Sequence, residues 1–245
     1  MIERAEPRPI EVDTSEGVTT IILSKPPRNL LDGDLVDAML EALTTADDDE
    51  NVTGILLTGS GDHFCGGLDV SNITSAADAI AAAAHLVELL RLLPKLRTPI
   101  VAAVNGDAIA GGASLVCACD YAVAVPGCRI GAHEVSIGFW PMVAQVPLIH
   151  RLGARRAMEN VGSGEPFSAA RALEVGIVNR LASNDELLDA AAQWLALAKR
   201  GYPGRDVFYR FAAMSYEQAL DESLSELANM LEARPDVAER LGHNH

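Results

Sequence analysis

Positive charge, aromatic side chains and long apolar runs are all scarce in this 245-residue chain. Lysine and arginine number 19 against 34 acidic residues, and the formal net charge of -15 argues against binding to nucleic acid or to an anionic membrane surface. No uninterrupted apolar run reaches membrane-spanning length, and no apolar segment follows the first charged residues, so we expect a cytoplasmic protein. Aromatic residues make up only 4%, which leaves the core to aliphatic side chains and alanine.

Cysteine is also scarce, with four residues at Cys65, Cys117, Cys119 and Cys128. The spacing Cys117-x-Cys119 is too sparse for a metal-binding framework, and on a helix it would not bring two sulfurs to one face. We therefore expect buried thiols and no metal site.

Hydrophobic periodicity predicts alternating strands and helices in the first part of the chain. Short apolar runs predict buried strands, and helical spacing after Asp32 predicts a helix between the first two of them. Proline and glycine mark several ends. The predicted strands cover residues 18–23, 54–58, 100–104 and 121–125, and a long alanine- and leucine-rich helix covers 76–93. Strands separated by helices require parallel pairing, so the pattern indicates an α/β fold.

After about Pro141 the sequence shows little strand signal and several helical patterns, some of them ended by glycine. The predicted helices cover residues 145–153, 154–162, 168–176, 185–201 and 214–233. Helices this rich in alanine and leucine must cover their apolar faces by packing on the α/β core or on another subunit.

Two glycine-rich segments follow predicted strands. Residues 102–115 pass from an apolar run through Gly111 and Gly112 into a helical pattern, and residues 64–70 form a second glycine-rich exit. Glycine leaves room for a reacting group, and the free N–H groups at a helix start attract negative charge. Two such donors aimed at one oxygen form an oxyanion hole. The segments therefore predict a site that stabilises a developing oxyanion.

Several blocks in a fixed order carry a resemblance to a known family. They are residues 23–31, 64–70, 102–120 and 131–141, followed by 164–172 and 176–178. By these motifs the chain resembles the crotonase (enoyl-CoA hydratase/isomerase) superfamily from Val18 to Leu181. The resemblance implies an α/β spiral of ββα repeats with the active site in residues 1–190. It also implies a C-terminal helical region, residues 191–245, that helps to form a homotrimer or a dimer of trimers.

The resemblance also implies residue roles. The two oxyanion N–H groups of the family fall on Leu68 and Gly111, where they would stabilise the enolate of an acyl-CoA thioester. Hydratases of the family use two glutamates, one after the oxyanion glycines and one in a Pro-Glu dipeptide. This chain has Ser114 and Glu134 at those positions, and His133 replaces the proline. Serine cannot act as a carboxylate base unless another base activates it.

One carboxylate favours isomerisation over hydration. Hydration needs a base for water and an acid for the α-carbon, whereas one carboxylate can remove a proton from C2 and return it at C4. The pattern resembles the Δ3,Δ2-enoyl-CoA isomerases, so we expect Glu134 to be the proton shuttle. A glutamate introduced at Ser114 would restore the second acid of the hydratases. Two alternatives stay open: a hydratase or decarboxylase in which Ser114 positions water or a carboxylate, and a degenerate member that only binds acyl-CoA.

For coenzyme A, the resemblance implies contacts mainly from backbone groups. These fall on Arg28, Asn29, Leu30, Gly66 and Val70. We expect no cofactor other than the coenzyme A of the substrate.

The remaining roles are open in the sequence. Lys25 and Arg28 are the nearby cations for the phosphates. Phe139 and Trp140 follow Glu134, where family members shape the acyl pocket; Trp140 either limits the acyl chain or anchors the core. Ser114 fits helix packing and a polar pocket contact equally well.

Overall fold

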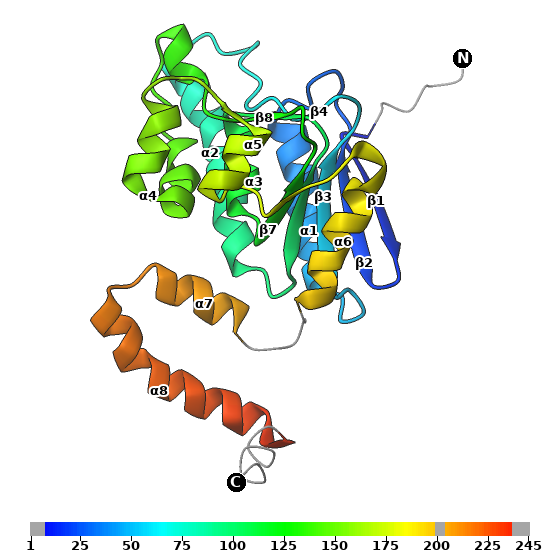
Figure 1. The fold of residues 1–245 in the computed structure, drawn as a ribbon, viewed down its shortest axis with the longest axis vertical. Coiled ribbons are helices and arrows are strands. Elements are labelled where there is room, and N and C mark those ends of the chain that lie inside the picture. The colour runs from blue at the N-terminus through cyan, green and yellow to red at the C-terminus, as the bar shows by residue number, and fades with distance from the viewer. Residues whose placement is uncertain (1–7, 199–203, 237–245) are drawn as a thin grey trace. The chain divides into compact units, whose positions relative to one another are not determined.

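The computed structural model describes residues 8–198 and 204–236. Contacts group residues 1–200 into one compact unit and residues 201–245 into a second. The first unit contains both sheets, and the second contains two helices (Figure 1). The boundary expected between residues 190 and 191 falls inside the last helix of the first unit.

The larger sheet has six strands in the order β1-β2-β3-β5-β7-β10. All neighbouring pairs are parallel except the β1–β2 hairpin. The hairpin turns at Glu16 and Gly17, which both have positive φ, as a tight two-residue turn requires. The strands are β1 (Ile10–Ser15), β2 (Val18–Leu23), β3 (Gly54–Gly59), β5 (Ile100–Val104), β7 (Tyr121–Ala124) and β10 (Arg180–Leu181).

The smaller sheet has four short strands in the order β4-β6-β8-β9. The first three run parallel, and β9 is antiparallel to β8. The strands are β4 (His63–Cys65), β6 (Asp107–Ile109), β8 (Arg129–Gly131) and β9 (Phe167–Ser168).

Three successive units of the chain each add one strand to the larger sheet, one strand to the smaller sheet and then helical structure. The units are β3-β4-α2, β5-β6-α3 and β7-β8 followed by η2 and α4. The Asn105 side chain, which follows β5, links the first two units. It accepts from Gly59 N–H, at the end of β3, at 3.0 Å and donates to the Gly61 carbonyl, just after β3, at 2.8 Å. The expected spiral of ββα repeats is thus the observed fold. After the strand expected at residues 100–104, residues 107–109 form a second strand, in the smaller sheet, that the sequence pattern did not indicate.

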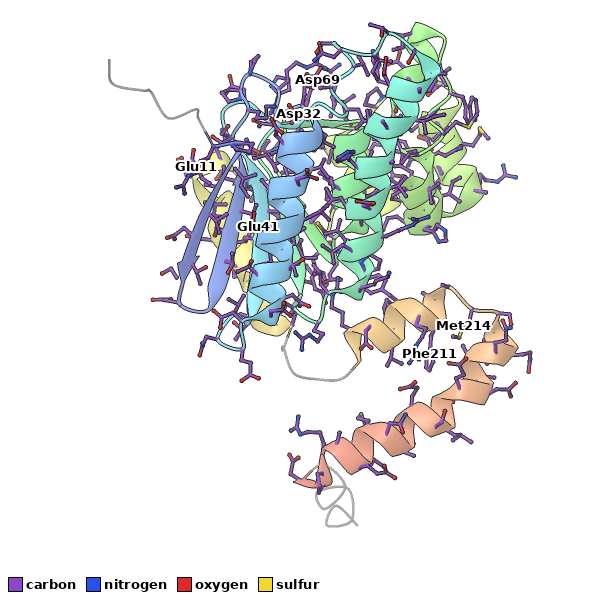
Figure 2. The ribbon with its side chains drawn as sticks, turned by 180° about the vertical axis from the view of Figure 1, so that it is seen from behind. Glu11, Asp32, Glu41, Asp69, Phe211 and Met214 are labelled. Atoms are coloured by element: carbon purple, nitrogen blue, oxygen red, sulfur yellow. The ribbon has the colours of Figure 1, made fainter. Side chains whose placement is uncertain are left out.

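The helices of the first unit cover both faces of the larger sheet. In Figure 1, α6 crosses the front of this sheet and α1 lies behind it, and Figure 2 shows the same arrangement from behind. Trp194 of α6 stacks on Tyr121 of β7 with ring centroids 4.6 Å apart. The helices are α1 (Gly33–Asp48), α2 (Ala76–Leu92), α3 (Gly111–Ala118), α4 (Gln145–Val161), α5 (Ala169–Val175) and α6 (Leu187–Leu197), with 3-10 turns η1 (Leu93–Lys95), η2 (Glu134–Ile137) and η3 (Asn184–Glu186).

Local sequence signals explain the helix ends. The Asp32 side chain accepts from Leu35 N–H at the start of α1, and Ser168 caps α5, which ends at Gly176 with positive φ. Gly153, with φ +72° and ψ 159°, interrupts α4 where the sequence predicts one helix ending and another beginning. The second unit contains α7 (Arg205–Ala212), which the sequence analysis missed, and α8 (Tyr216–Ala233).

The core is aliphatic, as the composition predicts. Fully buried side chains come from β2, β3 and β5 and from the inner faces of α1 and α2. All four cysteines are buried free thiols, and burial raises the pKa of Cys65 to about 12. In the part of the chain that the structure describes, no helix is long and apolar enough to cross a membrane.

Candidate active site

The candidate site lies where the three parallel strands of the smaller sheet end. Cys65 of β4 pairs with Ala108 of β6, and Ile109 of β6 pairs with Gly131 of β8. Because parallel strands end at the same sheet edge, the segments 66–68, 110–111 and 132–134 emerge next to one another. These segments hold Leu68, Gly111 and Glu134, which are far apart in the sequence.

We call the segments 66–68, 110–111 and 132–134 the first, second and third exits. The first and second exits come into close contact at Gly67. A Cβ at Gly67 would lie 2.9 Å from the Ala110 Cβ, 3.0 Å from the Ile109 carbonyl oxygen and 3.2 Å from the Gly111 nitrogen. Gly67 also has φ +92°, which side chains rarely adopt. The close approach of the two backbones therefore depends on glycine at position 67.

Neighbouring hydrogen bonds hold both exits and leave their N–H groups available. Leu31 N–H donates to the Gly67 carbonyl at 2.8 Å, and Asp69 N–H donates to the Leu31 carbonyl at 2.9 Å. Ala110 N–H donates to the Gly131 carbonyl at 2.9 Å. Among the described residues, neither Leu68 N–H nor Gly111 N–H donates to another part of the chain. This leaves two backbone donors for an external oxygen.

Ala110 has a strained backbone at the start of α3. Its φ of 52° and ψ of −116° lie outside the regions that residues with a Cβ prefer. Such conformations cost about 1–3 kcal/mol and persist where the surroundings hold them. Here the Ala110–Gly131 hydrogen bond and the tight contact with Gly67 hold the turn.

Glu134 begins η2 and is partly exposed. Its Oε2 accepts from His133 N–H at 2.8 Å, a donor that proline at position 133 would lack. The His133 ring lies 3.2 Å from the Gly164 carbonyl through Nδ1, and Ser136 Oγ lies 3.0 Å from Nε2. The imidazole therefore contacts the neighbouring loop and η2.

Asn160 of α4 anchors the backbone just before Glu134, and the sequence analysis missed it. Its amide accepts from Ala132 N–H at 2.7 Å and donates to the carbonyls of Ala132 and Glu165 at 2.8 Å each. The side chain is fully buried, and a Cβ at Gly131 would lie only 2.7 Å from its nitrogen. In the sequence, the only signal for this role is a polar residue at an otherwise apolar position of a predicted helix.

Ser114 lies inside α3 with no exposed surface. Its Oγ is 3.3 Å from the Ala110 carbonyl oxygen and 3.2 Å from the Ala144 carbonyl oxygen, and the hydroxyl can donate to either. Ala144 is the residue before α4. The hydroxyl thus links two helix starts, and both of its neighbours are acceptors.

The segments expected to contact coenzyme A lie beside the first exit. Gly66 N–H donates to the Arg28 carbonyl at 2.8 Å, and a Cβ at Gly66 would contact Leu30 and the Arg28 guanidinium. Leu30 is partly buried, and Val70 is exposed.

Asn29 serves the fold through its side chain. It is fully buried and donates to the carbonyls of Ser60 at 3.0 Å and His63 at 2.8 Å. Its Oδ1 accepts from Lys25 N–H at 3.0 Å. The side chain is therefore engaged within the protein, and any contact of Asn29 with a ligand would come from its backbone.

Phe139 and Trp140 are exposed rather than part of the core. Their side chains are 60% and 40% exposed, and Trp140 Nε1 donates to Gln145 at 2.9 Å. The core-anchor interpretation of Trp140 is therefore wrong for the isolated chain. Both residues follow η2, close in sequence to Glu134.

The chain is similar to several known proteins. The chain matches the family described as enoyl-CoA hydratase/isomerase over residues 13–241. A putative enoyl-CoA hydratase of Thermus thermophilus is 34% identical over 180 residues, 71% of each chain. A probable enoyl-CoA hydratase of Mycobacterium bovis is 30% identical over 220 residues, 89% of this chain and 84% of the relative.

A solved structure shares the fold over almost the same extent. It is the crystal structure of an enoyl-CoA hydratase of Mycobacterium smegmatis, with a TM-score of 0.85, 29% identity and coverage of 92% of this chain and 91% of that chain. The family match takes in all three exits of the smaller sheet. The chain belongs to the enoyl-CoA hydratase/isomerase family.

Proposed function

We propose that this protein is a Δ3,Δ2-enoyl-CoA isomerase that uses Glu134 as its only catalytic carboxylate. The observation that carries the proposal is the environment of Ser114, the position where hydratases of the family have a second glutamate. Ser114 is buried against two carbonyl oxygens and carries no carboxylate, so of the two positions only Glu134 supplies an acid. The family relatives are named hydratases, so the choice of reaction rests on this difference.

The proposed mechanism uses two backbone N–H groups and one carboxylate. The thioester oxygen accepts from Leu68 N–H and Gly111 N–H, which stabilise the negative charge that develops when a proton leaves C2. Glu134 takes that proton and returns it to C4, so the double bond moves from C3–C4 to C2–C3. The proton that leaves C2 is returned at C4, so one carboxylate is sufficient and no water is consumed.

Phe139 and Trp140 are proposed to cover the acyl chain. Their exposed apolar surface lies directly after the turn that carries Glu134. An acyl chain that packs on this surface would remove both rings from water, at about 25 cal/mol per Å² of buried apolar area.

The active assembly is proposed to be a homotrimer or a dimer of trimers. In the described part of the second unit, no residue of α7 or α8 is buried. Phe208, Leu224 and Tyr216 are 66%, 74% and 77% exposed. Apolar side chains gathered on two helices favour association with other copies of the chain.

The proposed reaction is tested by following two conversions with the unmodified protein. A 3-enoyl-CoA should be converted to the 2-enoyl-CoA, and the 2-enoyl-CoA should be hydrated slowly in comparison. Efficient hydration without isomerisation would favour the hydratase alternative. Binding of acyl-CoA without turnover of any thioester would favour the alternative of a binding protein.

A further inference from the structure

Two carboxylates and two cations share the surface beside the first exit. Leu31 and Leu68 form an isolated parallel bridge, so the residues that follow them, Asp32 and Asp69, emerge together. Figure 2 shows both carboxylates at the same end of α1. Lys25 and Arg28 come from the segment just before this bridge.

Asp32 neutralises one of the two cations. Its Oδ2 forms an ion pair with Lys25 Nζ, and both side chains are about one-third exposed. The same carboxylate accepts from Leu35 N–H through Oδ1 at 3.0 Å, so it is fixed in place as the cap of α1. Lys25 therefore already has a partner, and an incoming anion would compete with it for the ammonium group.

Asp69 adds a second negative charge at the same place. The hydroxyl and N–H of Ser71 lower the pKa of the Asp69 carboxyl, so it is ionised at neutral pH. Asp69 does not cap a following helix, because the cap of α2 is Ser75. Arg28 is the remaining cation of this group, and it has no ion-pair partner among the described residues.

The surface beside the oxyanion donors thus carries two positive and two negative charges, in a chain with a net charge of -15. The pantetheine arm of an acyl thioester is uncharged, whereas the nucleotide of coenzyme A carries a diphosphate and a 3′-phosphate. A surface without net positive charge gives these phosphates little attraction.

We infer that the site selects its substrate by the acyl-pantetheine part, and that Asp32 limits selection for the nucleotide by holding Lys25. The substrate class is acyl thioesters of the pantetheine arm, with or without the nucleotide. This inference rests on the proposed function, because it requires the thioester to lie at Leu68 and Gly111.

The test compares the affinities of butyryl-CoA and butyryl-pantetheine, which carry no double bond to move, by calorimetry at low salt. The unmodified protein should bind butyryl-CoA more tightly by less than about tenfold, through Arg28 and added contact area. Asp32→Asn should raise this preference about threefold to fivefold, since asparagine caps a helix as well as aspartate but releases Lys25. The gain should vanish at high salt.

Two control variants isolate the ion pair. Asp34→Asn removes the same charge two residues away, in the first turn of α1, and should leave the preference within twofold. Adding Lys25→Met to Asp32→Asn should return the preference to its original value. A preference of 100-fold or more in the unmodified protein would overturn the inference, and so would equal effects of Asp32→Asn and Asp34→Asn.

Measuring isomerisation alongside binding distinguishes a failure of this inference from a failure of the proposed function. If both ligands bind as expected but no 3-enoyl thioester is isomerised, the proposed reaction fails and the inference stands. If isomerisation occurs with a preference of 100-fold or more for the nucleotide, the proposed reaction stands and the inference fails. Absence of binding for both ligands would overturn both.

Discussion

Two buried asparagines hold the loops of the candidate site. Asn29 ties the segment before α1 to the turn between β3 and β4, and Asn160 ties the segment before Glu134 to α4. Each amide satisfies backbone groups that would otherwise be buried without partners, which costs about 1–3 kcal/mol per group. The loops that carry Leu68 and Glu134 are therefore held in defined positions.

Some residues of the candidate site can be predicted from the sequence, and others cannot. Glycine pairs and the missing glutamate are visible in the chain, and they predict the segments around Leu68, Gly111 and Glu134. The roles of Asn160 and of the Lys25–Asp32 pair are not visible, because their partners are distant backbone groups or depend on side-chain direction. The residue roles in catalysis remain predictions.

The first prediction concerns Ser114→Glu. Both groups around the Ser114 hydroxyl are carbonyl oxygens, so a carboxylate there would be buried without donors. We expect Ser114→Glu to lower the free energy of unfolding by about 2–4 kcal/mol and to give no gain in hydration, although it would restore the second acid of the hydratase pattern. Ser114→Ala is the control and should cost about 0.5–1.5 kcal/mol.

Urea unfolding at fixed protein concentration, together with a hydration assay, measures both effects. A folded Ser114→Glu protein with raised hydration would show that the site accommodates the second acid.

At the scale of the elements, strand and helix patterns predict the larger sheet well and the smaller sheet poorly. Residues 18–23 and 100–104 are strands with the expected bounds, and α1 follows the expected spacing. The strands β4, β6 and β8 have three residues each, too few for any periodicity. Their pairing arises from the winding of the chain, and it is this pairing that assembles the site.

The second prediction tests the contact between the exits of β4 and β6. Gly67→Ala would place a Cβ within 3.0 Å of Ala110 and Ile109, at a residue with φ +92°, and would push the two N–H donors apart. We expect kcat to fall about 10² to 10³-fold, as when an oxyanion donor is lost.

Gly61→Ala is the matched control for this variant. Gly61 has φ +69° and open space around it, so it carries the same backbone cost without the collision. Steady-state kinetics of both variants measure the difference. Equal losses in kcat would mean that backbone strain alone, and not the contact of the two exits, explains the effect.

At the scale of the whole molecule, the composition correctly predicts an aliphatic core with buried thiols. The net charge of -15 also predicts weak steering of anionic ligands. Several described arginines are paired with acidic side chains, as Arg129 is with Asp107 and Arg171 with Glu159. Assembly depends on contacts between chains, so it stays a prediction that rests on the exposed apolar residues of α7 and α8.

The third prediction concerns assembly. Exposed apolar residues on α7 and α8 should be covered by other copies of the chain. Light scattering at micromolar concentration should give three or six times the chain mass of 25.9 kDa. Leu224→Glu, which places a charge on the exposed apolar face of α8, should reduce that mass. A mass of one chain for the unmodified protein would refute the proposed trimer.

The central claim is that one carboxylate performs the proton transfer. Glu134→Gln keeps the shape of the side chain and both backbone donors but removes the base. The exposed Glu165, in the loop next to His133, provides the matched control Glu165→Gln.

The most direct measurement is therefore the rate of 3-enoyl-CoA isomerisation in the unmodified, Glu134→Gln and Glu165→Gln proteins, with acyl-CoA affinity measured alongside. We expect Glu134→Gln to lower kcat by about 10² to 10⁴-fold with affinity within twofold, and Glu165→Gln to leave both values unchanged. Isomerisation by Glu134→Gln at the unmodified rate would contradict the one-carboxylate mechanism.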